Sequence, residues 1–203
     1  STHDTMLFFS QMGKCFWLPV YQIPEGTRTS KGRAIQNMIS LPPDDKIMAY
    51  IDIHDLEDEA FINEHYLVFC TKKGTIKKTT VEAFSRPRAN GIVAINIAEG
   101  DELLAVRLTN GNCEVMMAVK SGRAIRFPEE KVRPMGRTAT GVIGIELADD
   151  QDEVVGMITV EKGDKEKTVL VVSENGYGKR SQLVDQETGE QEYRITNRGG
   201  KGV

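Results

Sequence analysis

The sequence has few of the residues that mark a disulfide-stabilised, metal-binding or membrane-spanning protein. Its 203 residues include three cysteines, Cys15, Cys70 and Cys113, with no CxxC spacing. A disulfide framework is therefore not expected, and a reducing compartment fits best. The three histidines have no metal-ligand spacing, and no apolar run approaches the roughly 18 residues of a membrane-spanning helix. Since no signal peptide opens the chain either, we expect a cytoplasmic protein with no membrane and no metal site.

The composition is otherwise that of a folded domain. Hydrophobic residues make up 39% of the chain, which allows a sizeable core and argues against general disorder. The net charge is −4, from 26 Lys and Arg against 30 Asp and Glu. Taken alone, that balance argues weakly against nucleic-acid binding.

One pattern recurs four times along the chain. Each unit opens with an apolar stretch that runs into a turn glycine and then a basic stretch. A second glycine follows 17 to 26 residues later. An acidic turn and another apolar stretch complete the first three units, with Asp45, Asp101 and Asp152 at the turns. The approximate repeats are 5–55, 65–110, 113–160 and 167–203, and the predicted structural turn glycines, in pairs, are Gly13 and Gly32, Gly74 and Gly91, Gly122 and Gly141, and Gly176 and Gly202.

A period near 50 residues built of short strands and tight turns predicts blades rather than a helical solenoid. The apolar stretches are short and rich in β-branched and aromatic residues, which favours strands. Glycine suits the turns because it adopts positive φ at no steric cost. Residues 56–64 form either one short helix or an acidic loop. We therefore expect an all-β, propeller-like disc with about four blades in this chain.

Charge is segregated in register with the repeat. Residues 70–91 contain six basic residues and one acid, whereas residues 92–115 contain one base and four acids. The third unit repeats this division. Because equivalent positions of a blade array fall on the same rim, we expect a basic rim that could neutralise the phosphates of a duplex.

The bases also recur at fixed offsets. Four residues after the turn glycine stand Lys78, Arg126 and Arg180, with Trp17 as the exception. Four residues before the second glycine stand Arg28, Arg137 and Arg198. The alternative is a set of solvated charges that keep strand edges from aggregating. The predicted duplex-binding residues are Lys14, Arg28, Lys31, Arg33, Lys72, Lys73, Lys77, Lys78, Arg86, Arg88, Lys120, Arg123, Arg126, Arg133, Arg137, Lys179, Arg180, Arg198 and Lys201.

Four stretches, residues 20–28, 74–79, 132–142 and 175–180, resemble the C-terminal domain of the DNA gyrase A protein, the β-pinwheel that wraps DNA. Each stretch is weak alone, but four in order are specific. The paralogous domain of topoisomerase IV shares the fold and much of the pattern, so it stays open as the alternative.

The resemblance implies a single β-pinwheel domain whose blades exchange strands, as part of a bacterial type II topoisomerase. Its partners would be double-stranded DNA, the rest of the gyrase A protein and the gyrase B protein in an A2B2 assembly associated with the chromosome. The fragment would have no catalytic residue and no cofactor, since the catalytic tyrosine and the site for ATP and Mg²⁺ would lie elsewhere in the holoenzyme. Chiral wrapping would let gyrase introduce negative supercoils, whereas topoisomerase IV would decatenate DNA without strong wrapping.

The family's gyrase box, a Gln-Arg-Arg-Gly-Gly-Lys-Gly-like segment, is expected upstream of Ser1. The nearest match within the chain is residues 197–202, in the fourth unit. This segment does not fit a nucleotide-binding P-loop, and residues 149–153 lack the glycine and glutamate of a calcium loop. A propeller used as a protein-interaction scaffold would show a mixed rim, and an enzyme would need polar residues that converge on a central channel.

Overall fold

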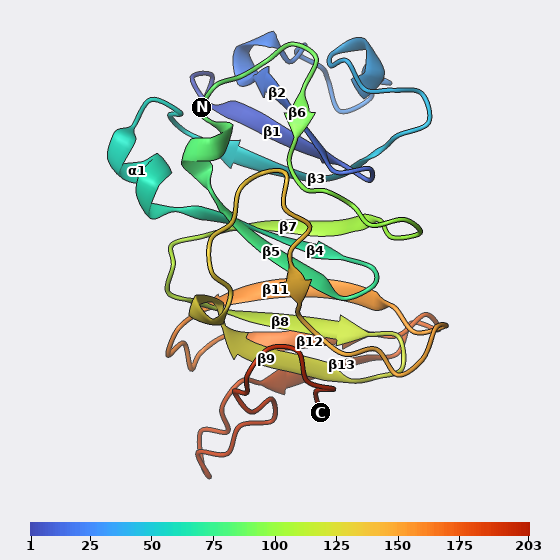
Figure 1. Ribbon diagram of the computed structural model, residues 1–203, viewed down its shortest axis with the longest axis vertical. Helices are drawn as coiled ribbons and strands as arrows, with labels where there is room; N and C mark the ends of the chain where they lie inside the picture. The colour runs from blue at the N-terminus through green and yellow to red at the C-terminus, as the bar shows by residue number, and fades with distance from the viewer.

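The computed structural model describes residues 1–203 as four antiparallel β-sheets. In Figure 1 the first three follow one another down the molecule, and the fourth overlaps the third. The first sheet has the order β3-β1-β2-β6, from β1 (Thr5–Ser10), β2 (Lys14–Pro19), β3 (Ile47–Ile53) and β6 (Ile92–Val93). The second has the order β10-β5-β4-β7, from β4 (Tyr66–Thr71), β5 (Thr75–Thr80), β7 (Leu103–Thr109) and β10 (Val142–Ile143). The third has the order β11-β8-β9, from β8 (Cys113–Val119), β9 (Ala124–Pro128) and β11 (Val154–Glu161), and the fourth pairs β12 (Thr168–Val172) with β13 (Gly178–Gln182).

Short helical turns lie between the strands. Single 3-10 turns are η1 (Val20–Gln22), η2 (Ile35–Asn37), η3 (Val81–Phe84) and η4 (Glu129–Lys131). Of the two structures predicted for residues 56–64, the short helix is the one formed, as α1 (Glu59–Glu64). The Asp58 carboxylate caps its N-terminus by accepting a hydrogen bond from the Phe61 N–H at 3.2 Å. No helix is both long and apolar enough to cross a bilayer.

Consecutive units exchange strands. In sequence β6 belongs to the second unit, yet it pairs with β2 of the first, with Ile92 opposite Cys15. In the same way β10 of the third unit pairs with β5 of the second. At the end of the fourth unit Val203 exchanges two main-chain hydrogen bonds of 2.8 Å with Ala124 of β9. Each of the last three units therefore pairs with the edge of the sheet before it.

The second glycine of each later unit permits this exchange. A Cβ atom on Gly91 would lie 2.8 Å from the Cys15 carbonyl oxygen, and one on Gly141 would lie 2.5 Å from that of Ile76. A Cβ atom on Gly202 would collide in the same way with Ala124 of β9. Positive φ is found at every turn position proposed from the sequence, at Gly13, Gly32, Gly74, Gly91, Gly122, Gly141, Gly176 and Gly202.

The aspartates at the acidic turns hold the hairpins. In each of the first three units the Asp Oδ1 atom accepts a hydrogen bond from the main chain of the turn between the first two strands. The bonds join Asp45 to Met12 at 3.1 Å, Asp101 to Lys73 at 3.0 Å and Asp152 to Ser121 at 2.9 Å. The recurring acid thus braces the hairpin, and its charge is stabilised locally by N–H donors.

The cores lie between adjacent sheets. Between the first two sheets Phe9 meets Phe69 edge to face, with ring centroids 5.4 Å apart, and also packs on Phe84. A second cluster, which includes Met117 and Phe127, joins the second sheet to the third. Stacking of sheets therefore depends on residues from neighbouring units.

Replacement of Gly141 by alanine should destabilise the fold more than replacement of Gly122. Both positions have positive φ, which costs an L-residue roughly 1–2 kcal/mol. A Cβ atom meets nothing within 4 Å at Gly122 but collides with the Ile76 carbonyl at Gly141. Urea denaturation should show a loss at least about 2 kcal/mol larger for Gly141→Ala. Equal losses would contradict the close approach.

Replacement of Asp152 by alanine should lower the free energy of unfolding, because hydrogen bonds from the Ser121 and Ala148 N–H groups to a charged acceptor are removed. The exposed Asp150 offers a matched control, Asp150→Ala. Bonds from the Ala148 N–H and from Ser121 keep the pKa of Asp152 below its usual range. The stabilisation should therefore be present above about pH 4 and fade as the pH falls below it. The free energy of unfolding would be measured against pH for both proteins. If the difference between Asp152→Ala and the native chain stayed constant as the pH falls, this role would be refuted.

Candidate nucleic-acid interface

Three loops carry bases from one unit to the sheet of the unit before. We call residues 85–91, 132–141 and 194–202 the basic loops. None of them contains an acid. Together they hold Arg86, Arg88, Arg133, Arg137, Arg194, Arg198 and Lys201.

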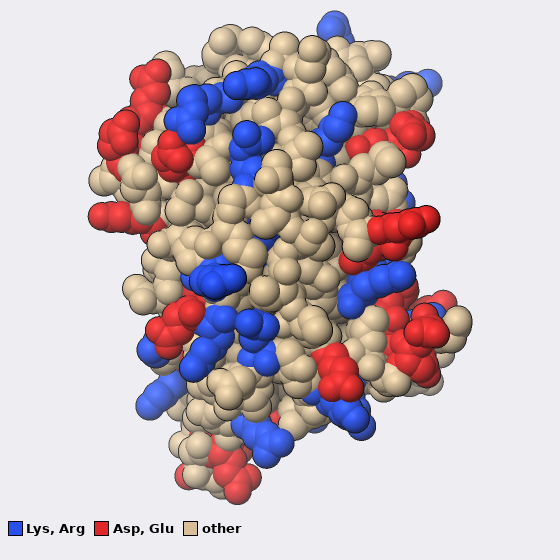
Figure 2. Space-filling model, viewed as in Figure 1, with Lys and Arg blue, Asp and Glu red and all other residues tan.

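The basic loops lie on one face of the molecule. Figure 1 shows the loops before β6 and β10 crossing the sheets on the side toward the viewer. In the same view Figure 2 shows Lys and Arg side chains in an upper and a lower group on this face, with mostly uncharged surface between them. Acidic side chains gather mostly toward its left and right edges. A chain with a net charge of −4 thus gathers bases on this face.

Two arginines tie the basic loops to the sheets beneath them. The Arg137 Nη1 atom donates to the Val93 carbonyl at 3.0 Å, and the Arg198 Nη1 atom donates to the Ile143 carbonyl at 3.1 Å. Val93 and Ile143 are the last residues of β6 and β10, so the two bonds are equivalent. Both side chains stay partly exposed. Since a guanidinium has five N–H donors, each can hold its loop and still face a phosphate.

Three of the predicted duplex-binding residues are buried, which corrects the sequence-based prediction for them. Lys77, Lys78 and Arg126 have exposed fractions of 0%, 4% and 3%. The Arg126 guanidinium forms an ion pair of 2.6 Å with the equally buried Glu114. These side chains cannot reach a phosphate because neighbouring units cover them.

The two buried lysines have partners inside the protein. The Lys77 Nζ atom donates to the Ala94 carbonyl at 2.7 Å and the Arg137 carbonyl at 2.5 Å. Burial, together with the nearby Arg137 charge, lowers the pKa of Lys77 to about 8. The Lys78 Nζ atom lies 4.8 Å from the centre of the Tyr66 ring, and burial also lowers the pKa of Lys78. Both ammonium groups are used within the fold.

Trp17, the apparent exception at the fourth position after the turn glycine, shares the structural role of Lys78 and Arg126. Its indole Nε1 atom donates to the Phe84 carbonyl in the next unit at 2.9 Å. What recurs at this position is a side-chain N–H donor that reaches the next unit. Charge alone does not reveal this shared role, because the tryptophan side chain is neutral.

The other predicted residues lie at or near the surface. Exposed and without an ion pair are Arg28, Lys31, Arg33, Lys73, Arg88, Lys120, Arg123, Arg133 and Arg180, while Lys14 is half-buried. Four more form ion pairs near the surface, which are Lys72 with Glu102, Arg86 with Glu82, Lys179 with Glu192 and Lys201 with Glu146. Surface pairs contribute little stability, so phosphate could replace the carboxylates. Arg194 and Lys131 are two further exposed bases in or beside the basic loops, and neither is among the predicted duplex-binding residues.

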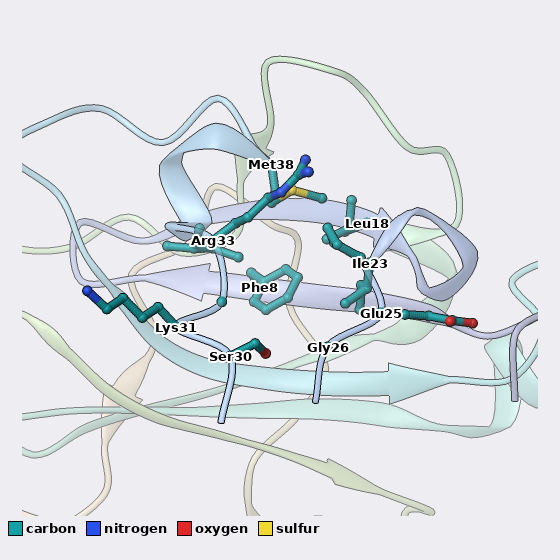
Figure 3. Close-up of a pocket in the computed structure, with 12 residues that line it drawn as sticks. Phe8, Leu18, Ile23, Glu25, Gly26, Ser30, Lys31, Arg33 and Met38 are labelled. Atoms are coloured by element: carbon teal, nitrogen blue, oxygen red, sulfur yellow. The ribbon is translucent and has the colours of Figure 1, made fainter. Parts of the chain in front are cut away.

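The corresponding loop of the first unit is arranged differently. It folds over the sheet of its own unit and encloses a pocket of about 500 Å³ above Phe8 and Leu18 (Figure 3). Lys31 and Arg33 lie at the edge of this pocket with their charged ends away from Phe8. A Cβ atom on Gly32 would meet nothing within 4 Å, unlike one on the second glycine of any later unit.

The sequence matches the family described as DNA gyrase C-terminal domain, beta-propeller, over residues 4–49, 65–110, 114–161 and 167–203. The chain belongs to this family. It is 47% identical over its whole length to the DNA gyrase A protein of Staphylococcus epidermidis, of which it spans 21%. The predicted all-β pinwheel fold and the resemblance to the gyrase A protein are confirmed.

Solved structures of the family superimpose on the whole chain. The C-terminal domain of DNA topoisomerase IV gives a TM-score of 0.83 at 27% identity, with 58% of that chain covered. The DNA gyrase A C-terminal domain gives 0.75 at 26% identity, with 60% covered. The fold is therefore common to both branches of the family.

Chemical labelling should separate the buried lysines from the exposed ones. An amine-reactive acetylating reagent should modify Lys73 and Lys131 in the folded chain at least about tenfold faster than Lys77 and Lys78, since modification of the latter requires local opening. Peptide mass spectrometry gives the rates, and the urea-unfolded chain serves as the control in which all four should react alike. Rapid native labelling of Lys78 would contradict its burial.

Proposed function

We propose that this chain is the DNA-wrapping domain of a DNA gyrase A protein and that duplex DNA lies along the basic loops. The observation that carries the proposal is the recurrence of acid-free loops with exposed arginines at equivalent positions of consecutive units. Membership of the gyrase C-terminal domain family supports it. Bases spaced along one face can neutralise phosphates unit after unit.

Recognition would depend on phosphates and on DNA shape. The loops present arginine and lysine side chains, and the face they cross offers no long helix for a major groove. Bending 20–30 base pairs by 40–90° costs on the order of 1–6 kcal/mol. Interactions from several units together would offset that cost.

The same proposal includes the partners of this domain. The domain would act with the remainder of the gyrase A protein and with the gyrase B protein in a cytoplasmic A2B2 assembly. ATP, Mg²⁺ and the DNA-cleaving tyrosine would belong to other parts of that assembly. We propose one β-pinwheel domain made of the four units for this chain itself.

Loss of exposed arginines should lower both the affinity for DNA and the dependence of that affinity on salt concentration. Arg88, Arg133 and Arg194, one from each basic loop, are exposed and form no ion pair. Their replacement by glutamine should reduce the slope of log K against log salt by up to about 0.9 for each phosphate that is no longer neutralised. Lys46→Gln, Lys162→Gln and Lys165→Gln together form the matched control, with three exposed lysines outside the loops. Fluorescence anisotropy with a short duplex measures both quantities, and equal effects of the two triples would refute the assignment of the interface.

A measurement of DNA topology distinguishes a gyrase domain from a topoisomerase IV domain. Nicked plasmid would be ligated in the presence of the chain, freed of protein and resolved into topoisomers. Chiral wrapping should leave a positive shift in linking number. Tight binding without a shift would favour a topoisomerase IV type of domain, and no binding at low salt would favour a protein-interaction scaffold.

A further inference from the structure

Three side chains at one repeat position connect each unit to the next. We call Trp17, Lys78 and Arg126 the clamp residues. Trp17 donates to the Phe84 carbonyl at 2.9 Å, Lys78 to the Glu129 carbonyl at 3.2 Å and Arg126 to the Tyr193 carbonyl at 3.2 Å. Each stands four residues after its turn glycine, and each acceptor belongs to the following unit.

Every accepting carbonyl lies where a basic loop begins. Phe84 ends η3 and directly precedes loop 85–91. Glu129 opens η4, the turn that leads into loop 132–141. Tyr193 directly precedes loop 194–202. The clamp residues therefore fix the point from which each basic loop leaves its own unit.

The main chain of two clamp residues holds the same loops at a second point. The Lys78 carbonyl accepts from the Met135 N–H at 2.7 Å, and the Arg126 carbonyl accepts from the Thr196 N–H at 2.8 Å. With Arg137 and Arg198 bonded farther along, these loops are attached at several points. A loop attached in this way presents its bases in one arrangement.

The charges of the clamp residues are used locally. Tyr66 lies beside Lys78, and Glu114 lies beside Arg126. These two partners occupy equivalent places in β4 and β8. Each stands two residues before the strand residue that pairs with the clamp residue. Trp17 carries no charge. The donor at this position is neutral in one unit, and in the other two its charge has a partner within the protein. Its shared role is therefore to hold the next unit in place, not to attract phosphate.

We propose that the clamp residues are positioning residues that set the arrangement of successive basic loops, and through it the path of the bound duplex. This inference rests on the proposed DNA-wrapping function. Bending DNA into one path requires that the bases of different units lie in register, and loops attached at several points hold them in that register. The clamp residues should therefore affect wrapping more than the number of phosphates bound.

Hydrogen exchange tests the clamp without DNA. Lys78→Met keeps an unbranched side chain, one atom shorter, and removes the donor, and Lys162→Met is the control at an exposed lysine. Exchange of the amides in loop 132–141, including that of Met135, should become at least about tenfold faster in Lys78→Met, which corresponds to roughly 1.4 kcal/mol of local stability. Unchanged exchange would overturn the clamp whatever the function of the domain.

Wrapping tests the positioning role. At a temperature where circular dichroism shows both proteins folded, the linking-number shift per bound Lys78→Met molecule should fall to half or less. The affinity for a short duplex should change less than threefold and its salt slope should stay the same. Lys78→Arg, which places the residue of the third unit in the second, should restore the shift. Trp17→Phe keeps an aromatic ring, removes the N–H and tests loop 85–91 independently if Lys78→Met does not fold.

The outcomes are distinguishable. A full linking-number shift in folded variants with faster exchange would reduce the clamp residues to a stabilising role and overturn the proposal. A lower salt slope in Lys78→Met would mean that Lys78 binds phosphate itself, which also overturns it. If the unmodified chain fails to bind or wrap DNA, the proposed function fails, while the exchange result still decides whether the clamp exists.

Discussion

The main-chain pairing between each unit's exchanged segment and the preceding sheet is the interaction on which the rest of the structure depends. Buried N–H and C=O groups must be paired, so β6 and β10 can only lie where β2 and β5 offer free edges. The chain must then cross from unit to unit, and the crossing loops come to lie on one face. Glycine at positions such as Gly141 is required because the two backbones approach too closely for a side chain.

This geometry separates charges that look alike in sequence. Lys78 and Arg133 both lie between the two glycines of a unit, yet one is buried as a donor and the other faces solvent. The acids divide in the same way, since Asp152 holds a hairpin while Asp150 lies at the surface. A net charge of −4 is therefore compatible with a face rich in bases, because the crossing loops carry bases and no acid.

Much of the fold could be predicted because its determinants are local. Turn glycines, apolar stretches and the recurring aspartate follow from φ preferences and from strand periodicity, and they predicted an all-β blade array. The helix at Glu59–Glu64 stayed ambiguous because a six-residue helix has little local preference of its own. The donor role of Trp17 was not apparent from the sequence for another reason: its partner Phe84 lies in a different unit, and nothing near Trp17 in the sequence indicates it.

The sequence by itself determined the repeat, the strand and turn positions, the family and the excess of bases between paired glycines. Only the tertiary structure decided which of those bases are accessible. Burial of Lys77, Lys78 and Arg126 results from segments of the next unit that pack over them, including the carbonyls of Arg137, Glu129 and Tyr193. Composition and spacing show where the charged residues lie in the sequence. Whether a charged group contacts solvent or a main-chain carbonyl depends on the packing of residues far apart in the chain.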